Sequence, residues 1–363
     1  MDLKVTQENL NKALNNVARI ASSRTTLPIL NNILIQAQNN RLKIAATNLD
    51  IAISQHVGTK IEKEGSLTIP ARLFHDYINN MPTSTISLKQ DGNKLHINTN
   101  NYKSTINGTP IDDYPVMPAI SEGSSFVIPA QAFKKSLQQV LFAASSDEAR
   151  PVLTAVYLHT INGVLFIAAT DSYRLAEKQI QDVKNEVSLL IPVSAIVDLV
   201  RVISDQAQDI DISYDGQQVC FALESIELIT RLIDGNYPDY KKLIPTTFKN
   251  TAKVKKTDLI AVTKVAGLFS RENAGSITVT LNEEENSLYV DAIASQVGEN
   301  SSKVEGVING SESITLNSRY LLDGLQAISS DEITFNFNGK LEPIVLKDEK
   351  DSSYTHVIMP LKS

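Results

Sequence analysis

The residue types most often used in catalysis or metal binding are dispersed along this 363-residue chain. Its five histidines show no i, i+4 pair and no nearby thiolate, so they predict no metal site. We expect each of them at the surface: His56, His75, His96, His159 and His356. The acidic runs Asp112-Asp113 and Glu283-Glu284-Glu285 adjoin turn residues. We interpret both runs as solvated loops rather than as metal ligands.

Nucleophilic chemistry has equally little support. Cys220 is the single cysteine, so an intrachain disulfide is excluded and a reducing cytoplasm fits best. The surrounding Val219 to Leu223 predicts a strand, which favours a core position for the thiol. No glycine-rich phosphate loop or Gly-x-Ser-x-Gly motif is present. A triad assembled from distant residues stays open, but we expect a binding scaffold without a catalytic site, metal or cofactor.

The charge pattern suggests what such a scaffold would bind. Net charge is −7, which by itself argues against nucleic acid. The six helices predicted below nevertheless carry ten Lys and Arg, counting Lys256, against five Asp and Glu. Basic helices in an otherwise acidic chain favour helices that face a polyanion. The alternative is that helices simply carry Lys and Arg at solvated positions.

Three stretches repeat one pattern at a fixed spacing, and this predicts the architecture that must position the charges. Ile44-Ala45-Ala46-Thr47 returns as Ile167-Ala168-Ala169-Thr170, 123 residues later, and a fainter copy, Val290-Asp291-Ala292, follows after another 123. Tyr114-Pro115 is repeated in Tyr237-Pro238. Copies of this length share one fold. We expect three domains, at residues 1–120, 124–246 and 247–363.

Each repeat holds two helix-plus-sheet halves. Apolar residues at three- and four-residue steps predict amphipathic helices, over residues 7–21, 71–80, 130–144, 193–204, 257–271 and 318–329. Thr6 and Lys256-Thr257 are candidate caps. Short runs of β-formers lie between the helices, and Thr85–Lys89 with Lys94–Asn98 predicts a hairpin. The fold class is therefore α+β, in tandem modules.

Four separated motifs give the chain a family resemblance. They are Arg24–Asn32, Ala168–Ala176, Asp234–Tyr240 and Val357–Leu361, in order and on the repeat period. The chain resembles the bacterial DNA polymerase III beta subunit, the replicative sliding clamp, over essentially its whole length. The resemblance implies three clamp-fold domains, a head-to-tail dimer and a closed ring whose helices line a hole for duplex DNA. It implies binding without sequence specificity and processivity by topology.

The resemblance also implies site residues. Arg24 and Arg150 stand where the family touches DNA, and helix placement adds Lys12, Lys134, Arg201 and Lys264. Asp147-Glu148 places negative charge beside the same path. A partner-peptide cleft between the second and third domains is implied at Leu153, Thr170, Ser172, Tyr173, Arg174, Leu175, Pro238, Lys242, Leu243, Pro343, Val357, Met359 and Leu361. The alternative for Val357, Met359 and Leu361 is that they simply complete the last strand of the core.

The implied dimer interface pairs Lys103, Ser104 and Ile106 with Leu268 and Phe269. Ser104 stands where the family often has an apolar residue, and we expect a somewhat weaker dimer. Implied partners are duplex DNA, a second copy of the chain, the clamp loader, the polymerase III catalytic subunit, and repair and translesion polymerases, mismatch-repair proteins and ligase. Met1 to Val5 lacks the layout of a signal peptide.

Two other functions stay open at this point. One is a binding module of the same fold that does not encircle DNA, such as a repeat adaptor for acidic peptides. The other is an enzyme, for example a hydrolase with dispersed acidic residues.

Overall fold

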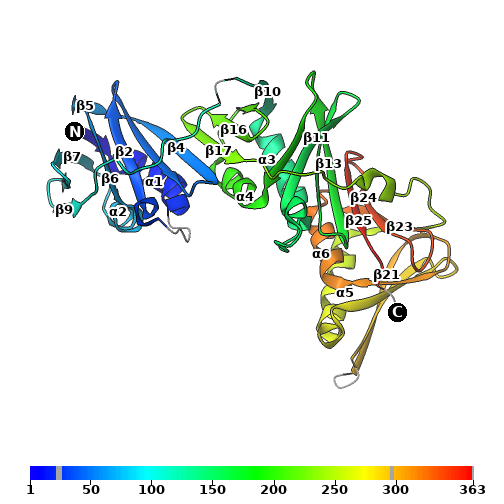
Figure 1. Cartoon of the computed structure of the whole chain (residues 1–363). Coiled ribbons are helices and arrows are strands. Elements are labelled where there is room, and N and C mark those ends of the chain that lie inside the picture. The colour runs from blue at the N-terminus through cyan, green and yellow to red at the C-terminus, as the bar shows by residue number, and fades with distance from the viewer. Residues whose placement is uncertain (22–26, 121, 295–297, 362–363) are drawn as a thin grey trace. The chain divides into compact units, whose positions relative to one another are not determined.

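The computed structural model describes residues 1–21, 27–120, 122–294 and 298–361. The chain forms two compact units, one of residues 1–131 with 197–232 and the other of residues 132–196 with 233–363. Figure 1 shows the elements along the chain.

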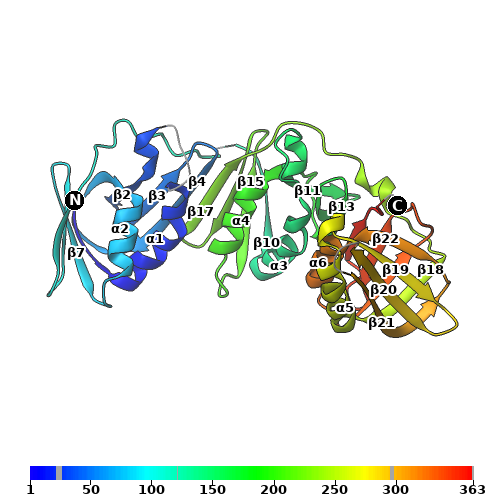
Figure 2. The same ribbon diagram turned by 90° about the horizontal axis from the view of Figure 1, so that it is seen from below.

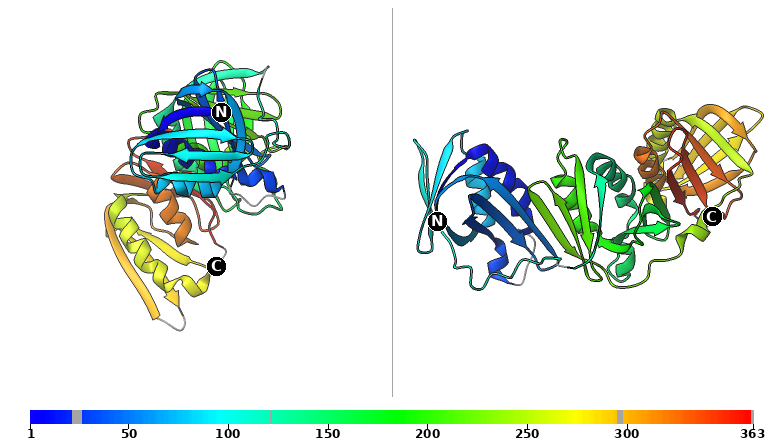
Figure 3. Two further views of the ribbon diagram at one scale, coloured as in Figure 1. Left: turned by 90° about the vertical axis from the view of Figure 1, so that its left-hand side faces the viewer. Right: turned by 90° about the horizontal axis from the view of Figure 1, so that it is seen from above.

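The first unit contains two antiparallel sheets. One has five strands in the order β5 (Lys60–Lys63), β1 (Asp2–Thr6), β7 (Thr85–Asp91), β8 (Lys94–Asn98) and β9 (Lys103–Asn107). The left-hand view of Figure 3 shows the N-terminus on this sheet. The other has eight strands in the order β10 (Ser124–Pro129), β15 (Asp209–Tyr214), β16 (Gln218–Leu223), β17 (Ile226–Arg231), β4 (Ile51–Gly58), β3 (Arg41–Thr47), β2 (Asn32–Gln38) and β6 (Gly65–Pro70).

Two helices cover one side of this unit. Helix α1 (Gln7–Ala21) packs on β3, β4 and its neighbour α2 (Ala71–Asn79), as Figure 2 shows. The apolar stripe of α1 is buried, because Leu10, Leu14 and Val17 recur on one helix face. Thr6 accepts a bond from the Asn9 N–H at 3.4 Å, which confirms the predicted cap. The β7–β8 hairpin is confirmed as well.

The second unit is built on one sheet of twelve strands. Their order is β14 (Ser188–Pro192), β11 (Ala155–Ile161), β12 (Val164–Thr170), β13 (Arg174–Asp182), β25 (Tyr354–Ile358), β24 (Ile344–Asp348), β23 (Glu332–Phe337), β18 (Asn250–Lys255), β21 (Gly298–Asn309), β20 (Ser287–Ala294), β19 (Ser276–Asn282) and β22 (Ser313–Asn317).

Helices α5 (Lys256–Phe269) and α6 (Ser318–Ala327) pack together in this unit. Helices α3 (Ala130–Val140) and α4 (Val193–Val202) each contain a unit boundary. The prediction of a cap at Lys256-Thr257 is wrong. Helix α5 follows Lys255 without a side-chain cap. By contrast, Asn317 caps α6 and accepts from the backbone N–H groups of Arg319 and Tyr320.

Sheets run on from one sequence repeat into the next. Strand β4 of the first repeat pairs antiparallel with β17 of the second. Strand β13 of the second repeat pairs in the same way with β25 of the third. Pairing at these junctions provides hydrogen-bond partners for backbone N–H and C=O groups at strand edges that would otherwise be unpaired. This pairing is why the compact units divide the chain inside the middle repeat.

Two histidines depart from the sequence expectation, because His159 and His356 are buried. The Nε2 of His159 bonds to the Tyr240 hydroxyl at 3.0 Å. His356 packs so closely on α6 that a Cβ at Gly324 would lie 2.3 Å from its Cδ2. Glycine at position 324 therefore makes room for the ring. The surface prediction fails here because strand pairing turns both side chains inward.

Cys220 and the two acidic runs lie where the sequence predicts them. Cys220 is buried on β16, and this burial raises the pKa of its thiol to about 11. Such a thiol is a poor nucleophile at neutral pH. The acidic runs at 112–113 and 283–285 are exposed turns. Within the described ranges, no cluster of His, Cys, Asp and Glu could hold a metal ion. No helix in those ranges is long and apolar enough to cross a bilayer.

Candidate functional site

The loop from Thr170 to Arg174, between β12 and β13, is the centre of the candidate site. The Thr170 hydroxyl accepts from the Ser172 N–H at 3.1 Å and donates to the Arg174 carbonyl at 2.6 Å. The Asp171 carboxylate accepts from the N–H groups of Tyr173 and Arg174, both at 2.9 Å. These bonds hold Ser172 in a left-handed conformation, with φ of 78°. The loop is therefore fixed, and the Tyr173 side chain is exposed.

Arg174 connects this loop to α6 and to the turn that contains Phe142. Its guanidinium donates to Asp171 at 3.0 Å, to Asp323 of α6 at 2.5 Å and to the Phe142 carbonyl at 2.8 Å. It also lies over the Tyr320 ring, 4.6 Å from the centroid. Because these partners occupy its donors, Arg174 positions the loop and α6 rather than offering free donors to a ligand.

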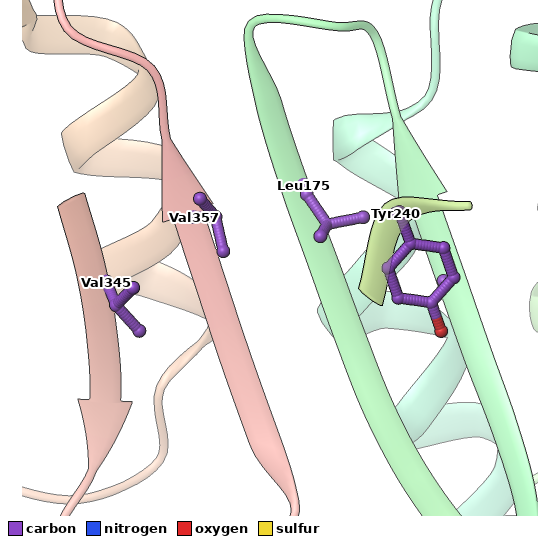
Figure 4. Close-up of a cluster of buried hydrophobic side chains, with 5 residues drawn as sticks. Leu175, Tyr240, Val345 and Val357 are labelled. Atoms are coloured by element: carbon purple, nitrogen blue, oxygen red, sulfur yellow. The ribbon is translucent and has the colours of Figure 1, made fainter. Parts of the chain in front are cut away.

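An apolar cluster lies beside the loop. Leu175 of β13 faces Val357 of β25, and Val357 faces Val345 of β24. Figure 4 shows these side chains together with Tyr240. All four are buried. Val357 therefore belongs to the core. For this residue the structure agrees with the alternative that the side chain completes the last strand of the core.

The linker after β17 packs onto the same cluster. Tyr237 stacks on Tyr157 with ring centroids 4.8 Å apart, and its hydroxyl accepts from the Thr170 N–H at 3.0 Å. Burial raises the pKa of Tyr237, so it stays a neutral phenol. The linker then presents Pro238, Lys242 and Leu243 to solvent. Lys242 pairs with Asp239 at 2.6 Å.

The chain end passes the loop on its other side. The Met359 N–H bonds to the Tyr173 carbonyl at 2.8 Å, and the Leu361 N–H bonds to the Thr315 carbonyl at 2.8 Å. Both side chains are half-buried, beyond the last residue of β25. Met359 and Leu361 are partly covered, and Tyr173 and Leu243 are exposed. These side chains leave apolar surface that a partner could cover.

The two remaining predicted cleft residues lie near these elements. Leu153 is buried in a short turn at Pro151–Thr154, and its carbonyl accepts from the Ser145 N–H at 2.9 Å. Pro343 is half-buried just before β24. The tyrosines and carboxylates that position the loop (Asp171, Tyr237, Tyr240 and Asp323) were missed as site residues. The sequence signals for Tyr237 were the repeated Tyr-Pro dipeptide and the Asp234–Tyr240 motif.

The basic candidates are distributed over both units. Lys12 is exposed on α1 and Lys264 on α5, whereas Lys134 is half-buried on α3. Arg201 of α4 lies 4.0 Å from Asp198, which also lies 3.7 Å from Arg19 of α1. Arg24 lies outside the described residues.

Arg150 is an exposed basic candidate that also contacts the 170–174 loop. Its guanidinium donates to Asp147 at 3.1 Å and to the Ser172 hydroxyl at 2.9 Å. Two hydrogen bonds hold the pKa of the Asp147 carboxyl below its usual range. The bond from the Ala149 N–H has the larger effect, and the bond from the Arg150 guanidinium adds to it. The negative charge of Asp147 is thus directed at Arg150.

Three domains of one family match the chain in order. They are the N-terminal, central and C-terminal domains of the DNA polymerase III beta subunit, at residues 1–118, 127–239 and 241–362. The chain belongs to the DNA polymerase III beta subunit family.

Relatives agree with this assignment along the whole length. The beta sliding clamp of Staphylococcus aureus is 29% identical over 376 residues, with 100% of both chains covered. The solved sliding clamp of Bacillus subtilis has a TM-score of 0.95 at 26% identity, covering 100% of this chain and 99% of its own. A solved clamp from Bartonella birtlesii, bound to griselimycin, has a TM-score of 0.94 at 26% identity, with both chains fully covered. The predicted family and its three tandem clamp domains are thereby confirmed.

The interface candidates of this beta subunit family member lie at a strand edge and a helix end. Lys103, Ser104 and Ile106 are on β9, the last strand of the five-stranded sheet. Ser104 is half-buried and Ile106 is buried. Leu268 and Phe269 close α5, and Leu268 is exposed.

Proposed function

We propose that this chain is a DNA sliding clamp. It encircles duplex DNA and tethers the replicative polymerase, and it confers processivity without a catalytic site of its own. The observation that carries the proposal is the match of three successive beta subunit domains along the chain. Ring closure by two copies makes the link topological, so that individual DNA contacts can stay weak and mobile.

The DNA contact is electrostatic and independent of base sequence. Arg24 and Arg150 contribute to it, together with Lys12, Lys134, Arg201 and Lys264. Exposed Lys and Arg side chains on helices attract phosphate without reading base edges. Lys12 and Lys264 have the exposure that this role needs.

The ring closes through two open strand edges. Among the described residues, strand β9 pairs only with β8, and residues 298–305 of β21 pair only with β20. The remainder of β21 pairs with β18 as well. Head-to-tail pairing of these edges would cover both and would bring Lys103, Ser104 and Ile106 toward Leu268 and Phe269.

Partner proteins bind the cleft around the 170–174 loop. A short flexible peptide with aliphatic and aromatic anchors would cover Leu243, Met359 and Leu361 and would contact Thr170, Ser172 and Tyr173. Pro238, Lys242 and Pro343 border this surface. Leu153, Leu175 and Val357 form its buried floor, and Arg174 fixes its geometry. The polymerase III catalytic subunit, the clamp loader and repair proteins are the partners.

The domain limits are residues 1–120, 124–246 and 247–363, and the site of action is the cytoplasm. The stretches between β9 and β10 and between β17 and β18 support these limits, because both connect one family domain to the next.

The decisive experiment separates topology from affinity. The protein is loaded onto nicked circular plasmid with a clamp loader, the complex is isolated, and the DNA is then linearised. We expect the protein to remain on the circle at moderate salt and to be lost from the linear form. Equal retention on both forms would mean ordinary affinity binding and would refute the sliding mechanism.

A further inference from the structure

A cavity of about 300 Å³ lies on the first unit, on the side of β2, β3 and β4 that α1 does not cover. Its lining is polar and basic throughout: Gln36, Gln38, Asn39, Arg41, Lys43 and His56. This cavity takes no part in the proposed DNA path, dimer interface or peptide cleft.

Strand register explains why these side chains converge. Gln36 of β2 faces Lys43 of β3, and Lys43 faces His56 of β4. Gln38 faces Arg41 in the next row on the same side of the sheet. Directly opposed residues in antiparallel strands have Cβ atoms about 5 Å apart. Two cations and an imidazole therefore share one small area.

The positive charge in this area is not neutralised. Within the described ranges, neither Arg41 nor Lys43 forms an ion pair, and Nδ1 of His56 has no hydrogen-bond partner. Two carboxylates are nearby. Glu64 accepts from the backbone N–H of Asn39 at 2.9 Å, and Glu227 acts electrostatically on His56 from β17. Burial is the main cause that lowers the pKa of His56, and the positive charge of Lys43 lowers it further. The negative charge of Glu227 acts in the opposite direction but does not outweigh them.

In the second repeat, the surface that corresponds to this cavity is covered by other residues. The residues 123 positions later, His159 and Phe166, face each other across β11 and β12 just as Gln36 and Lys43 do. There the linker covers the row. The Tyr240 hydroxyl bonds to His159, and Lys241 Nζ lies 4.0 Å from the Phe166 ring centroid. In the first repeat the corresponding pair borders the cavity, and it consists of the amide of Gln36 and the cation of Lys43 in place of two aromatic rings.

We propose that this cavity binds an acidic peptide segment of a partner protein, through carboxylates that contact Arg41, Lys43 and His56. Guanidinium and ammonium groups form strong charge-assisted bonds with carboxylates, and the two glutamine amides can orient them. Among the described residues, no Phe, Tyr or Trp lines the cavity, and the imidazole of His56 is the one ring that does. It therefore lacks a Phe, Tyr or Trp platform on which bases could stack, and two cations beside two amides favour the carboxylates of a peptide.

Fluorescence anisotropy with a labelled octaglutamate peptide tests the proposal on the full chain, with octaglutamine as the uncharged comparison. At about 50 mM salt, where screening is weak, we expect octaglutamate to bind and octaglutamine not to bind. The double substitution Arg41→Ala/Lys43→Ala should weaken its binding about tenfold or more, because each lost charge-assisted bond is a large part of the affinity. The matched control Lys184→Ala/Lys350→Ala removes the same charge from exposed positions outside the cavity and should change the affinity less than about twofold.

NMR titration of the histidine ring protons supplies a second readout. Bound carboxylates should raise the pKa of His56, because an anion near the ring favours the imidazolium. The proposal is overturned if octaglutamate does not bind, or if it binds the Arg41/Lys43 variant as tightly as the unmodified chain. Binding of inorganic phosphate in its place, without octaglutamate, would also overturn it. The result does not depend on ring closure, so failure of the clamp function would be recognised separately.

Discussion

At the scale of single residues, the site depends on buried polar groups more than on exposed ones. Arg174 joins the loop, α6 and the Phe142 carbonyl through three hydrogen bonds. Tyr237 caps the Thr170 N–H, and Tyr240 holds His159. These groups lie under the proposed peptide surface and give it one shape, which reduces the ordering cost of binding.

The buried histidines predict acid sensitivity. Burial lowers the pKa of His159 to about 4 and that of His356 to about 3, from an ordinary 6.5. A depressed pKa means that the unfolded chain binds protons more readily. The stability contributed by the neutral rings is therefore complete above pH 6.5 and is lost as pH falls toward these values. At pH 5 we expect each ring to reduce the free energy of unfolding by about 2 kcal/mol.

Urea unfolding at pH 7.5 and pH 5 measures this loss. In His159→Gln the pH-dependent loss should shrink by about half. The control His96→Gln changes a half-exposed ring on β8 and should leave the loss as it is in the unmodified chain. A loss of the same size in His159→Gln would contradict the assignment.

At the scale of elements, the end of β25 divides core from binding surface. Val357 is buried in the cluster, whereas Met359 and Leu361 are half-buried beyond the strand. Backbone bonds to Tyr173 and Thr315 hold this segment whatever its side chains are. Replacing Met359 and Leu361 by alanine should therefore leave β25 in place.

Met359→Ala/Leu361→Ala is predicted to abolish polymerase stimulation and to affect loading onto DNA less. Each side chain should contribute about 1 kcal/mol when a partner covers it, so peptide affinity should fall roughly 30-fold. Primer extension on a primed circle and peptide anisotropy measure the two effects. The control Val116→Ala/Val127→Ala trims exposed valines elsewhere. Equal stimulation by the cleft variant and this control would remove the cleft assignment.

At the scale of the whole molecule, continuity of the sheets is the organising feature. Pairing of β4 with β17 and of β13 with β25 carries each sheet from one repeat into the next. We propose that the edges of β9 and β21 repeat this arrangement between two copies. The dimer would then be a further instance of the junction already present twice in one chain.

Ser104 sets the expected strength of that dimer. A Phe-sized contact is worth roughly 1–3 kcal/mol, so Ser104→Phe should lower the dimer dissociation constant by about 5- to 150-fold. Sedimentation of both forms measures the change. Thr105→Phe, at the next position on β9, should not strengthen the dimer, because adjacent strand residues point to opposite faces. A dissociation constant well below nanomolar for the unmodified chain would contradict the expected weak interface.

The local sequence determined the helices and strands of this protein, whereas the tertiary structure determined which side chains meet at the site. Apolar spacing predicted the helices to within a few residues, because it depends on residues three and four positions apart. The 123-residue repeat predicted three copies of one fold, because similar sequences of this length share a fold. No local pattern could place Arg174 against Asp323, 149 positions away, or turn His159 and His356 inward. The same strands carry a covered aromatic row in one repeat and an open basic cavity in another. Only tertiary packing decides which, since the linker that covers the row is distant in sequence from the strands beneath it.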